Sequence, residues 1–207
     1  PNHLLYNVFG YGVYRSAHAI GLDWRAIDVL QITNSVVSVG AAILLYLILR
    51  RLTRSRYVVW SLTLMFAFSA TWWKFSTDAD SYILSVFFLL LTLLVTWPEQ
   101  RPRPLLSAVA FSAAALVHEL AVLTYPVFAL AIYWQSCPTS RRRQISLVLQ
   151  FCVISFLLIL GIYYGCFYLA SGSTGVARFF RWVTSASPDA SFSFNVVSNL
   201  GYSLRSN

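Results

Sequence analysis

The chain has 207 residues, of which 58% are hydrophobic and only 11% are charged, and its mean hydropathy is +0.66. Soluble globular domains are closer to half apolar and a quarter charged, so this composition excludes that class and predicts a membrane protein surrounded by lipid. The formal net charge of +8 does not predict a nucleic-acid partner, because membrane proteins concentrate Lys and Arg in their cytoplasmic loops.

The first predicted element is a helix over residues 4–20 that lies at the outer interface of the membrane. This stretch mixes apolar and aromatic residues with Arg15 and His18, and two glycines weaken it as a spanning helix. A turn at residues 21–23 follows, and Asp23 is a candidate cap for the next helix.

Apolar runs then follow that are each about long enough for a helix to cross a hydrocarbon core of roughly 30 Å. They cover residues 30–49, 57–73, 82–97, 105–134 and 147–169. The alternating polarity of membrane β-strands is absent, so the spans are predicted to be helical. After the last run, residues 176–185 place their apolar side chains on one helical face and predict a second interfacial helix.

Clusters of arginine predict which connections between these runs face the cytoplasm, because basic residues mark the cytoplasmic side. The clusters are Arg50, Arg51, Arg54 and Arg56, then Arg101 and Arg103, then Arg141, Arg142 and Arg143. The connection at residues 74–81 carries Asp78 and Asp80 with Lys74 as its single cation, and it is predicted to lie outside.

The long run at residues 105–134 begins and ends at connections assigned to the cytoplasm, so it must cross the membrane an even number of times. As one helix it would be about 45 Å long and would place Arg141 on the wrong side. We therefore predict a hairpin that turns near His118 and Glu119. A charge at the bilayer centre costs about 2.5 to 3.5 kcal/mol, so this pair indicates a protein-lined pocket rather than contact with lipid.

These patterns predict an all-α membrane protein, a multi-pass transmembrane helix bundle with interfacial helices on its outer side. About five to six helices are expected to enter the membrane, including the short hairpin. Because the sequence opens at Pro1 and stops at Asn207 in a polar stretch, we expect an internal fragment with a single transmembrane domain over 1–207. Its parts are an outer interfacial segment at 1–29, the helix bundle at 30–169, and an outer loop with an interfacial helix at 170–207.

Four stretches resemble, in this order, the N-terminal half of the GT-C class of membrane glycosyltransferases. They are "PNHLLYNVFGYGVYR", a helix ending in "LYLILRRL", "TWWKFSTDADSYILSVFFLLL" and "SAVAFSAAALVHELAVLTYPVFALAIYW". The chain is most similar to the bacterial branch akin to protein mannosyltransferases and lipopolysaccharide core sugar transferases. Pro1, Leu5 and Tyr6 match a Pro-rich segment that ends in Leu-Tyr. Trp73 matches an aromatic helix end, and Asp80 and Tyr82 match the outer loop that follows it. His118 and Glu119 match the polar tip of the hairpin.

The resemblance implies an enzyme that moves a sugar from a polyprenyl-phosphate carrier to an acceptor on the extracytoplasmic face of the plasma or inner membrane. The polyprenyl-phosphate-linked sugar is the donor substrate, the acceptor is unknown, and no cofactor or metal is predicted. In the family the catalytic aspartate precedes the Pro-rich segment, so the main base is expected upstream of Pro1.

Several polar residues are candidates for the site, and each has an ordinary alternative. Asp80, Glu119 and His118 are predicted to support catalysis. Asp80 is otherwise a helix cap or a solvated loop acid, and the other two are a polar pair that closes the hairpin. The predicted substrate contacts are His3, Lys74, Tyr82, Arg178 and Arg181, and the basic residues among them are otherwise interfacial side chains that reach toward the headgroups.

Two rival functions remain open at this point. A transporter or flippase for a lipid-linked substrate also needs polar groups in an outward cavity, and a non-catalytic membrane protein can share the fold. Transporters commonly carry paired broken helices in inverted repeats. The sequence predicts only one broken segment, at His118, which favours the enzyme.

Overall fold

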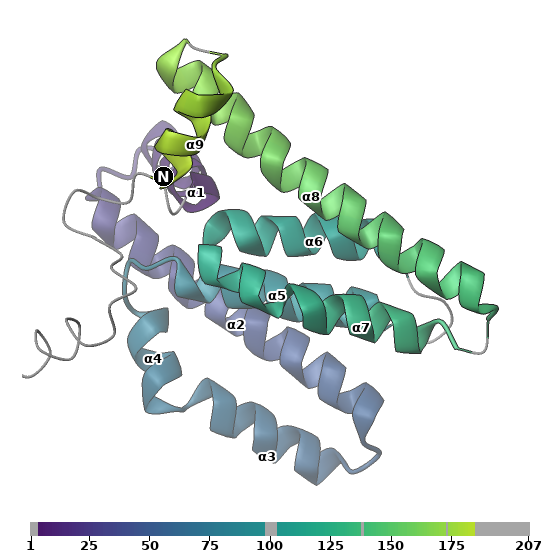
Figure 1. The fold of residues 1–207 in the computed structure, drawn as a ribbon. Coiled ribbons are helices and arrows are strands. Elements are labelled where there is room, and N and C mark those ends of the chain that lie inside the picture. Colours follow the sequence, from purple (N-terminus) through teal and green to yellow (C-terminus); the bar gives the residue numbers. More distant parts are fainter. Residues whose placement is uncertain (1–3, 98–102, 138, 173, 185–207) are drawn as a thin grey trace, which may run out of the picture. The chain divides into compact units, whose positions relative to one another are not determined.

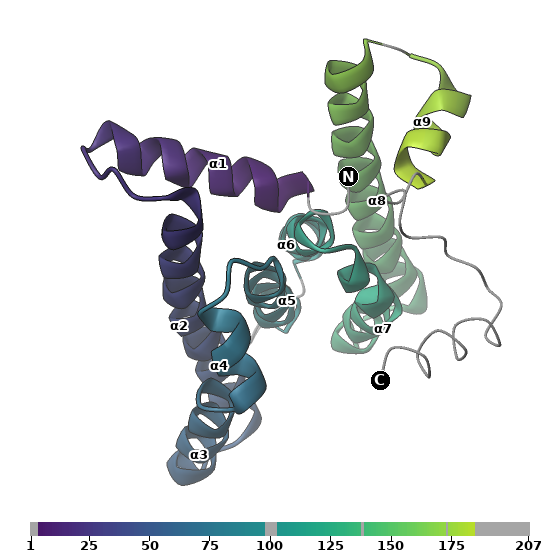
Figure 2. The same cartoon turned by 90° about the vertical axis from the view of Figure 1, so that its left-hand side faces the viewer.

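The computed structural model describes residues 4–97, 103–137, 139–172 and 174–184 (Figures 1 and 2). Over these ranges the chain forms helices and no β-strand. The helices are α1 (Leu4–Ala19), α2 (Ala26–Leu52), α3 (Arg56–Ala67), α4 (Ala70–Ser76), α5 (Tyr82–Thr96), α6 (Pro104–Val117), the 3₁₀ helix η1 (Glu119–Thr124), α7 (Tyr125–Gln135), α8 (Arg141–Ser171) and α9 (Val176–Thr184).

Internal contacts divide the chain into two units, one within Asn2–Tyr163 and one within Tyr164–Asn207. The first unit holds α1 to α7 and most of α8. The second holds the end of α8 and α9.

Two helices among the described residues are long and apolar enough to cross a membrane, α2 and the Arg141–Leu169 part of α8. Only 22% of the most apolar stretch of α2 and 11% of that of α8 are buried. Their apolar side chains therefore face outward, as expected of helices that contact lipid rather than a soluble core. The all-helical prediction is confirmed for the described residues.

The N-terminus of α2 differs from the prediction, because Asp23 does not cap it. The helix begins at Ala26 with Arg25 at its N-cap position, and no side chain caps it there. Instead, the Arg25 guanidinium donates two hydrogen bonds of 2.9 Å to the carboxylate of Asp28 in the first turn. The negative charge of Asp28 in the first turn also interacts favourably with the positive end of the helix dipole.

The predicted span at residues 57–73 is not one helix. It is divided into α3 and α4, because Phe68 ends the first and Ser69 begins the second. The Ser69 hydroxyl accepts a hydrogen bond from the backbone N–H of Trp72, which is the usual action of a serine N-cap. The 12 residues of α3 make a helix only about 18 Å long, shorter than a hydrocarbon core.

The long run at residues 105–134 is also broken, and the predicted chain reversal near His118 is confirmed. α6 ends at Val117, His118 has extended backbone, and η1 leads into α7. α6 and α7 run in opposite directions (Figure 1) and contact each other through Phe111 and Phe128, whose ring centroids are 5.7 Å apart. The chain thus reverses where the arginine pattern requires it.

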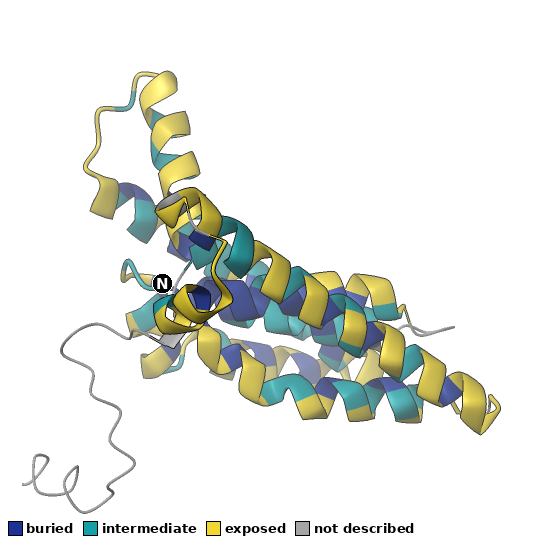
Figure 3. Cartoon of the chain, turned by 45° about the horizontal axis from the view of Figure 1, so that its top comes forward, coloured by how far each residue is buried: buried dark blue, intermediate teal, exposed yellow. Residues whose placement is uncertain are grey.

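α6 forms the centre of the first unit, and the buried residues gather there (Figure 3). Its Phe111 is fully buried and meets the edges of Phe128 on α7 and Phe151 on α8. Tyr125 closes this cluster, because its hydroxyl donates a 2.9 Å hydrogen bond to the backbone carbonyl of Cys152. Small residues on α6 allow α5 to pack closely along its length.

The first unit has two distinct ends. The C-terminus of α2 and the N-termini of α3, α6 and α8 lie toward one end (Figure 1), and the predicted cytoplasmic arginines in the described residues sit there. Arg101 lies outside the described residues. The loop at residues 77–81, the break at His118 and α1 lie toward the opposite end (Figures 1 and 2).

In the second unit, α9 folds back on the end of α8. Gly172 has a positive φ of 62° that ends α8 in the left-handed conformation glycine favours. Phe179 of α9 then contacts Tyr164 and Phe167 of α8, with ring centroids 5.5 and 5.6 Å apart. The amphipathic helix predicted at residues 176–185 is confirmed as α9.

Candidate functional site

A buried asparagine fixes the acidic loop at the end of the first unit opposite the arginines. Asn34 of α2 is 1% exposed, and its side-chain nitrogen donates 2.7 Å hydrogen bonds to the backbone carbonyls of both Asp78 and Asp80. The neighbouring Ser35 hydroxyl donates to the carbonyl of Ser76 at 3.0 Å. A buried amide with both hydrogens bonded holds the loop firmly, because breaking either bond would strand a polar group.

Tyr6 of α1 contacts the same buried asparagine. It is buried against Leu84 and Val117, and its hydroxyl lies 3.4 Å from the Asn34 side-chain nitrogen. Burial raises the pKa of Tyr6, and the nearby carboxylates of Asp80 and Asp78 raise it further, although the hydrogen bond from Asn34 lowers it. The phenol therefore stays neutral and keeps its proton available as a donor.

Asp80 is half-buried just before α5. Its carboxylate accepts a 2.6 Å hydrogen bond from the backbone N–H of Ser81 and lies 3.3 Å from the Ser81 hydroxyl. Ser81, not Asp80, is the N-cap residue of α5, so the helix-cap alternative does not describe Asp80. Asp78 is exposed, and its carboxylate accepts a 2.9 Å hydrogen bond from the backbone N–H of Ala79.

His118 forms the break between α6 and η1 and is only 7% exposed. Its Nδ1 accepts a 3.2 Å hydrogen bond from the backbone N–H of Leu120, which assigns the proton of the neutral ring to Nε2. The ring stacks on Tyr82, with centroids 4.4 Å apart and planes 30° apart. The next residue, Glu119, is exposed. His118 thus both ends the helix and lines the site.

An aromatic cavity of about 300 Å³ lies beside this stack, at the break between α3 and α4. Its lining includes Phe66, Ser69, Thr71, Trp72, Phe75 and Tyr82. Phe75 and Tyr82 have ring centroids 4.9 Å apart, so three rings run in contact from the cavity through Tyr82 to His118. The volume is at the lower bound of typical small-ligand sites.

Lys74 is the cation of this region. It lies exposed in the last turn of α4, and its Nζ is 5.9 Å from the centroid of the Phe75 ring. Lys74 is thus near a residue that lines the aromatic cavity but is not itself part of the lining. A cation next to an apolar cavity is suited to an amphiphile with an anionic group.

The structure brings some of the predicted residues together and not others. Tyr82 and His118 stack on each other, Asp80 lies in the loop two residues before Tyr82, and Lys74 lies on the preceding helix α4. His3 lies outside the described residues. Arg178 and Arg181 are exposed on α9, in the second unit, and their role stays a prediction. Over the described residues no group of three or more His, Cys, Asp or Glu side chains is placed to hold a metal ion.

Sequence reasoning missed Asn34, the role of Tyr6 and the aromatic cavity. The signal for Asn34 was present, since a polar residue inside an apolar helix is unusual and normally has a specific partner. The cavity had no such signal, because it depends on the break at Ser69.

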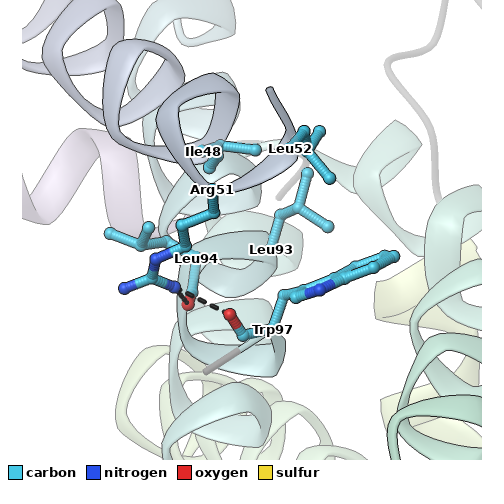
Figure 4. Close-up of a pocket in the computed structure, with 6 residues that line it drawn as sticks. All are labelled: Ile48, Arg51, Leu52, Leu93, Leu94 and Trp97. Atoms are coloured by element: carbon cyan, nitrogen blue, oxygen red, sulfur yellow. Dashed lines mark hydrogen bonds between the residues drawn. The ribbon is translucent and has the colours of Figure 1, made fainter. Parts of the chain in front are cut away.

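A second, smaller cavity lies at the opposite end and has a structural role. Arg51 of α2 donates 2.7 Å hydrogen bonds to the backbone carbonyls of Leu94 and Trp97 (Figure 4), two of the last carbonyls at the end of α5. Such carbonyls lack partners within the helix. The adjoining space of about 60 Å³ is small and almost wholly apolar, so it makes a poor ligand site.

Comparison of the chain with known protein families, with curated proteins and with solved structures finds no match.

Proposed function

We propose that the chain is part of a multi-pass membrane glycosyltransferase of the GT-C type. The outward apolar faces of α2 and α8 support a place in the bilayer. The arginines at one end of the first unit support a cytoplasmic assignment for that end, in the plasma or inner membrane. The site built around Asp80 then faces the extracytoplasmic side.

The proposed reaction transfers a sugar from a polyprenyl-phosphate carrier. The acceptor's hydroxyl oxygen attacks the anomeric carbon, and the bond from that carbon to the phosphate oxygen breaks. Polyprenyl phosphate leaves with the bonding electrons, and the acceptor's proton passes to a carboxylate. The family resemblance assigns that carboxylate to a preceding loop. We assign Asp80 to orienting the acceptor hydroxyl and Lys74 to the leaving phosphate.

One observation carries this proposal: Tyr82 stacks on His118, although α5 and α6 separate them in the chain, and Asp80 lies two residues before Tyr82. The packing of α5 on α6 brings Tyr82 against His118, and Asn34 fixes the backbone of Asp80. A carboxylate, an imidazole and a phenol are groups with which a sugar hydroxyl can form hydrogen bonds. Sugars are commonly bound by such hydrogen-bonding groups set against aromatic rings.

A transporter or flippase for a lipid-linked substrate is the second candidate, and one observation favours it. The structure breaks two segments, α3–α4 at Ser69 and α6–α7 at His118, where the sequence predicted one. Paired broken helices are typical of transporters. The count of broken segments therefore no longer separates the two functions.

Transfer and transport are separated by assaying the full-length protein in proteoliposomes with a radiolabelled polyprenyl-phosphate sugar and a mixture of hydroxyl acceptors. The proposed enzyme releases free polyprenyl phosphate, and Asp80→Asn lowers that release at least about tenfold, as expected for a positioned polar group. Asp23→Asn is the matched control, because the Asp23 side chain is 98% exposed in a different loop. Movement of intact lipid-linked sugar across the bilayer without release supports the transporter instead.

A further inference from the structure

We infer that an open groove on the outward face of α8 binds one anionic phospholipid, with the lipid phosphate on Arg142 and an acyl chain along the helix. The lipid belongs to the leaflet nearest the predicted cytoplasmic arginines. This inference stands apart from the proposed function, because the groove begins at the opposite end of the first unit from the Asp80 loop (Figure 1).

The groove has the length that such a lipid needs. Its volume is about 520 Å³, and its lining among the described residues comes from α8, between Arg142 and Ile154. These positions span about 18 Å along the helix axis. One leaflet of the hydrocarbon core is about 15 Å deep, so the groove extends from the headgroup region well into a single leaflet.

Polarity falls along the groove in the order that a phospholipid presents. Arg142, Ser146 and Gln150 line it and are spaced four residues apart, so they form one exposed row on the helix surface. Within the described part of the chain, no hydrogen bond satisfies the Ser146 hydroxyl or the Gln150 amide. Helical side chains lean toward the N-terminus. The hydroxyl and the amide therefore reach toward the ester carbonyls below a phosphate that is paired with the guanidinium.

An apolar row runs beside the polar row and suits an acyl chain. Ile145, Leu149 and Val153 line the groove and are exposed. Beyond Gln150 the described lining holds only Val153 and Ile154. Because only 11% of the most apolar stretch of α8 is buried, this face is open to a hydrocarbon chain over its whole length.

Charge complementarity selects an anionic headgroup. Arg141, Arg142 and Arg143 are exposed at the start of α8, and no carboxylate forms an ion pair with them among the residues that the structure describes. The sequence holds no acidic residue between Glu119 and Asp189, so α8 supplies no counter-ion of its own. The positive end of the α8 dipole lies at the same place. Basic residues in this position attract anionic lipids.

A second copy of the chain fits this face less well. In a pair of chains related by a two-fold axis along the membrane normal, the two α8 helices run parallel. Their arginine clusters would then approach each other, and such like-charge contacts are unfavourable. A single anionic lipid relieves this repulsion instead of adding to it.

The test is photo-crosslinking of the full-length protein in phosphatidylcholine nanodiscs that contain a trace of phosphatidylglycerol with a diazirine in one acyl chain. The label is expected on the α8 peptide that holds Leu149. Arg142→Gln should lower this labelling about fivefold, the contribution of one basic residue near an anionic headgroup. Arg54→Gln is the matched control, because it removes the same charge from a loop outside the groove and should leave labelling nearly unchanged.

A second pair of variants tests the groove itself. Leu149→Trp fills it and should lower labelling by a similar factor. Leu157→Trp should not, because Leu157 is 59% exposed on the same helix, as Leu149 is at 56%, but does not line the groove. Circular dichroism checks that both variants keep native helix content.

Three results would overturn the inference. The first is equal labelling of the same peptide by a phosphatidylcholine probe with the same diazirine, which would indicate ordinary lipid contact. The second is an equal loss of labelling in Arg142→Gln and Arg54→Gln, which would assign the effect to overall charge. The third is a protein dimer in native mass spectrometry that Leu149→Trp disrupts, which would assign the groove to a partner helix.

Discussion

The Tyr82 ring stacks on the His118 ring with centroids 4.4 Å apart, and this contact joins the start of α5 to the break at the end of α6. Each residue depends on the other's element for its position. α5 carries Tyr82 past the acidic loop, and the extended backbone at His118 turns the imidazole toward α5 rather than along α6.

Removal of the ring at position 82 should destabilise the protein more than removal of its hydroxyl. Tyr82→Ala is expected to lower the free energy of unfolding by about 1 to 3 kcal/mol, because it deletes two ring contacts, while Tyr82→Phe should stay within about 0.5 kcal/mol. Unfolding by SDS in mixed micelles measures this difference. Tyr57→Ala is the matched control, since Tyr57 is 87% exposed on α3. An equal effect at both positions would argue against the stack.

Loss of the Asn34 amide should release the acidic loop. Asn34→Leu is expected to lower stability by about 1 to 3 kcal/mol, because two loop carbonyls lose their donor. The same change should speed the reaction of a thiol reagent with a cysteine placed at Ala79, between the two anchored carbonyls. Ser38→Ala serves as control, because the Ser38 hydroxyl bonds only within α2. A loop cysteine that reacts at an unchanged rate would contradict the anchoring role.

The two ends of the first unit should face opposite sides of the membrane. In a variant without Cys137, Cys152 and Cys166, single cysteines replacing the exposed Glu119 and Ser140 should be labelled from opposite sides by an impermeant maleimide. This follows from the reversal at His118 together with the positive-inside rule. Labelling of both from one side would refute the proposed topology.

Arg51 should stabilise the fold through its hydrogen bonds and not only through its charge. Arg51→Ala is expected to cost about 1 to 2 kcal/mol of unfolding free energy, since it leaves two carbonyls at the end of α5 without a donor. Arg50→Ala removes the same charge one residue earlier and should change stability by less than about 0.5 kcal/mol. Comparable losses in both variants would assign the effect to net charge.

The chain reversal at His118 was predictable, because it follows from counting crossings between arginine-bearing connections. The helix α9 was predictable from its apolar face, and α1 from its mixture of apolar and aromatic residues with Arg15 and His18. The break at Ser69 was not, because a serine in an apolar run is compatible with a helix interior as well as with a cap, and the choice depends on tertiary packing. Asn34 stood out in the sequence, but its partners are 44 and 46 residues away, and no local pattern identifies such partners.

Asn34 binds main-chain carbonyl oxygens of the acidic loop. The contacts that fix the loop on α2 are therefore separate from the carboxylates that could take part in a reaction. Whatever side chains stand at positions 78 and 80, their peptide carbonyls can still be held in the same way. An exchange of either acid for Asn keeps the held carbonyl and also a side-chain oxygen for the next backbone N–H, so it tests the carboxylate's charge with little disturbance of the loop.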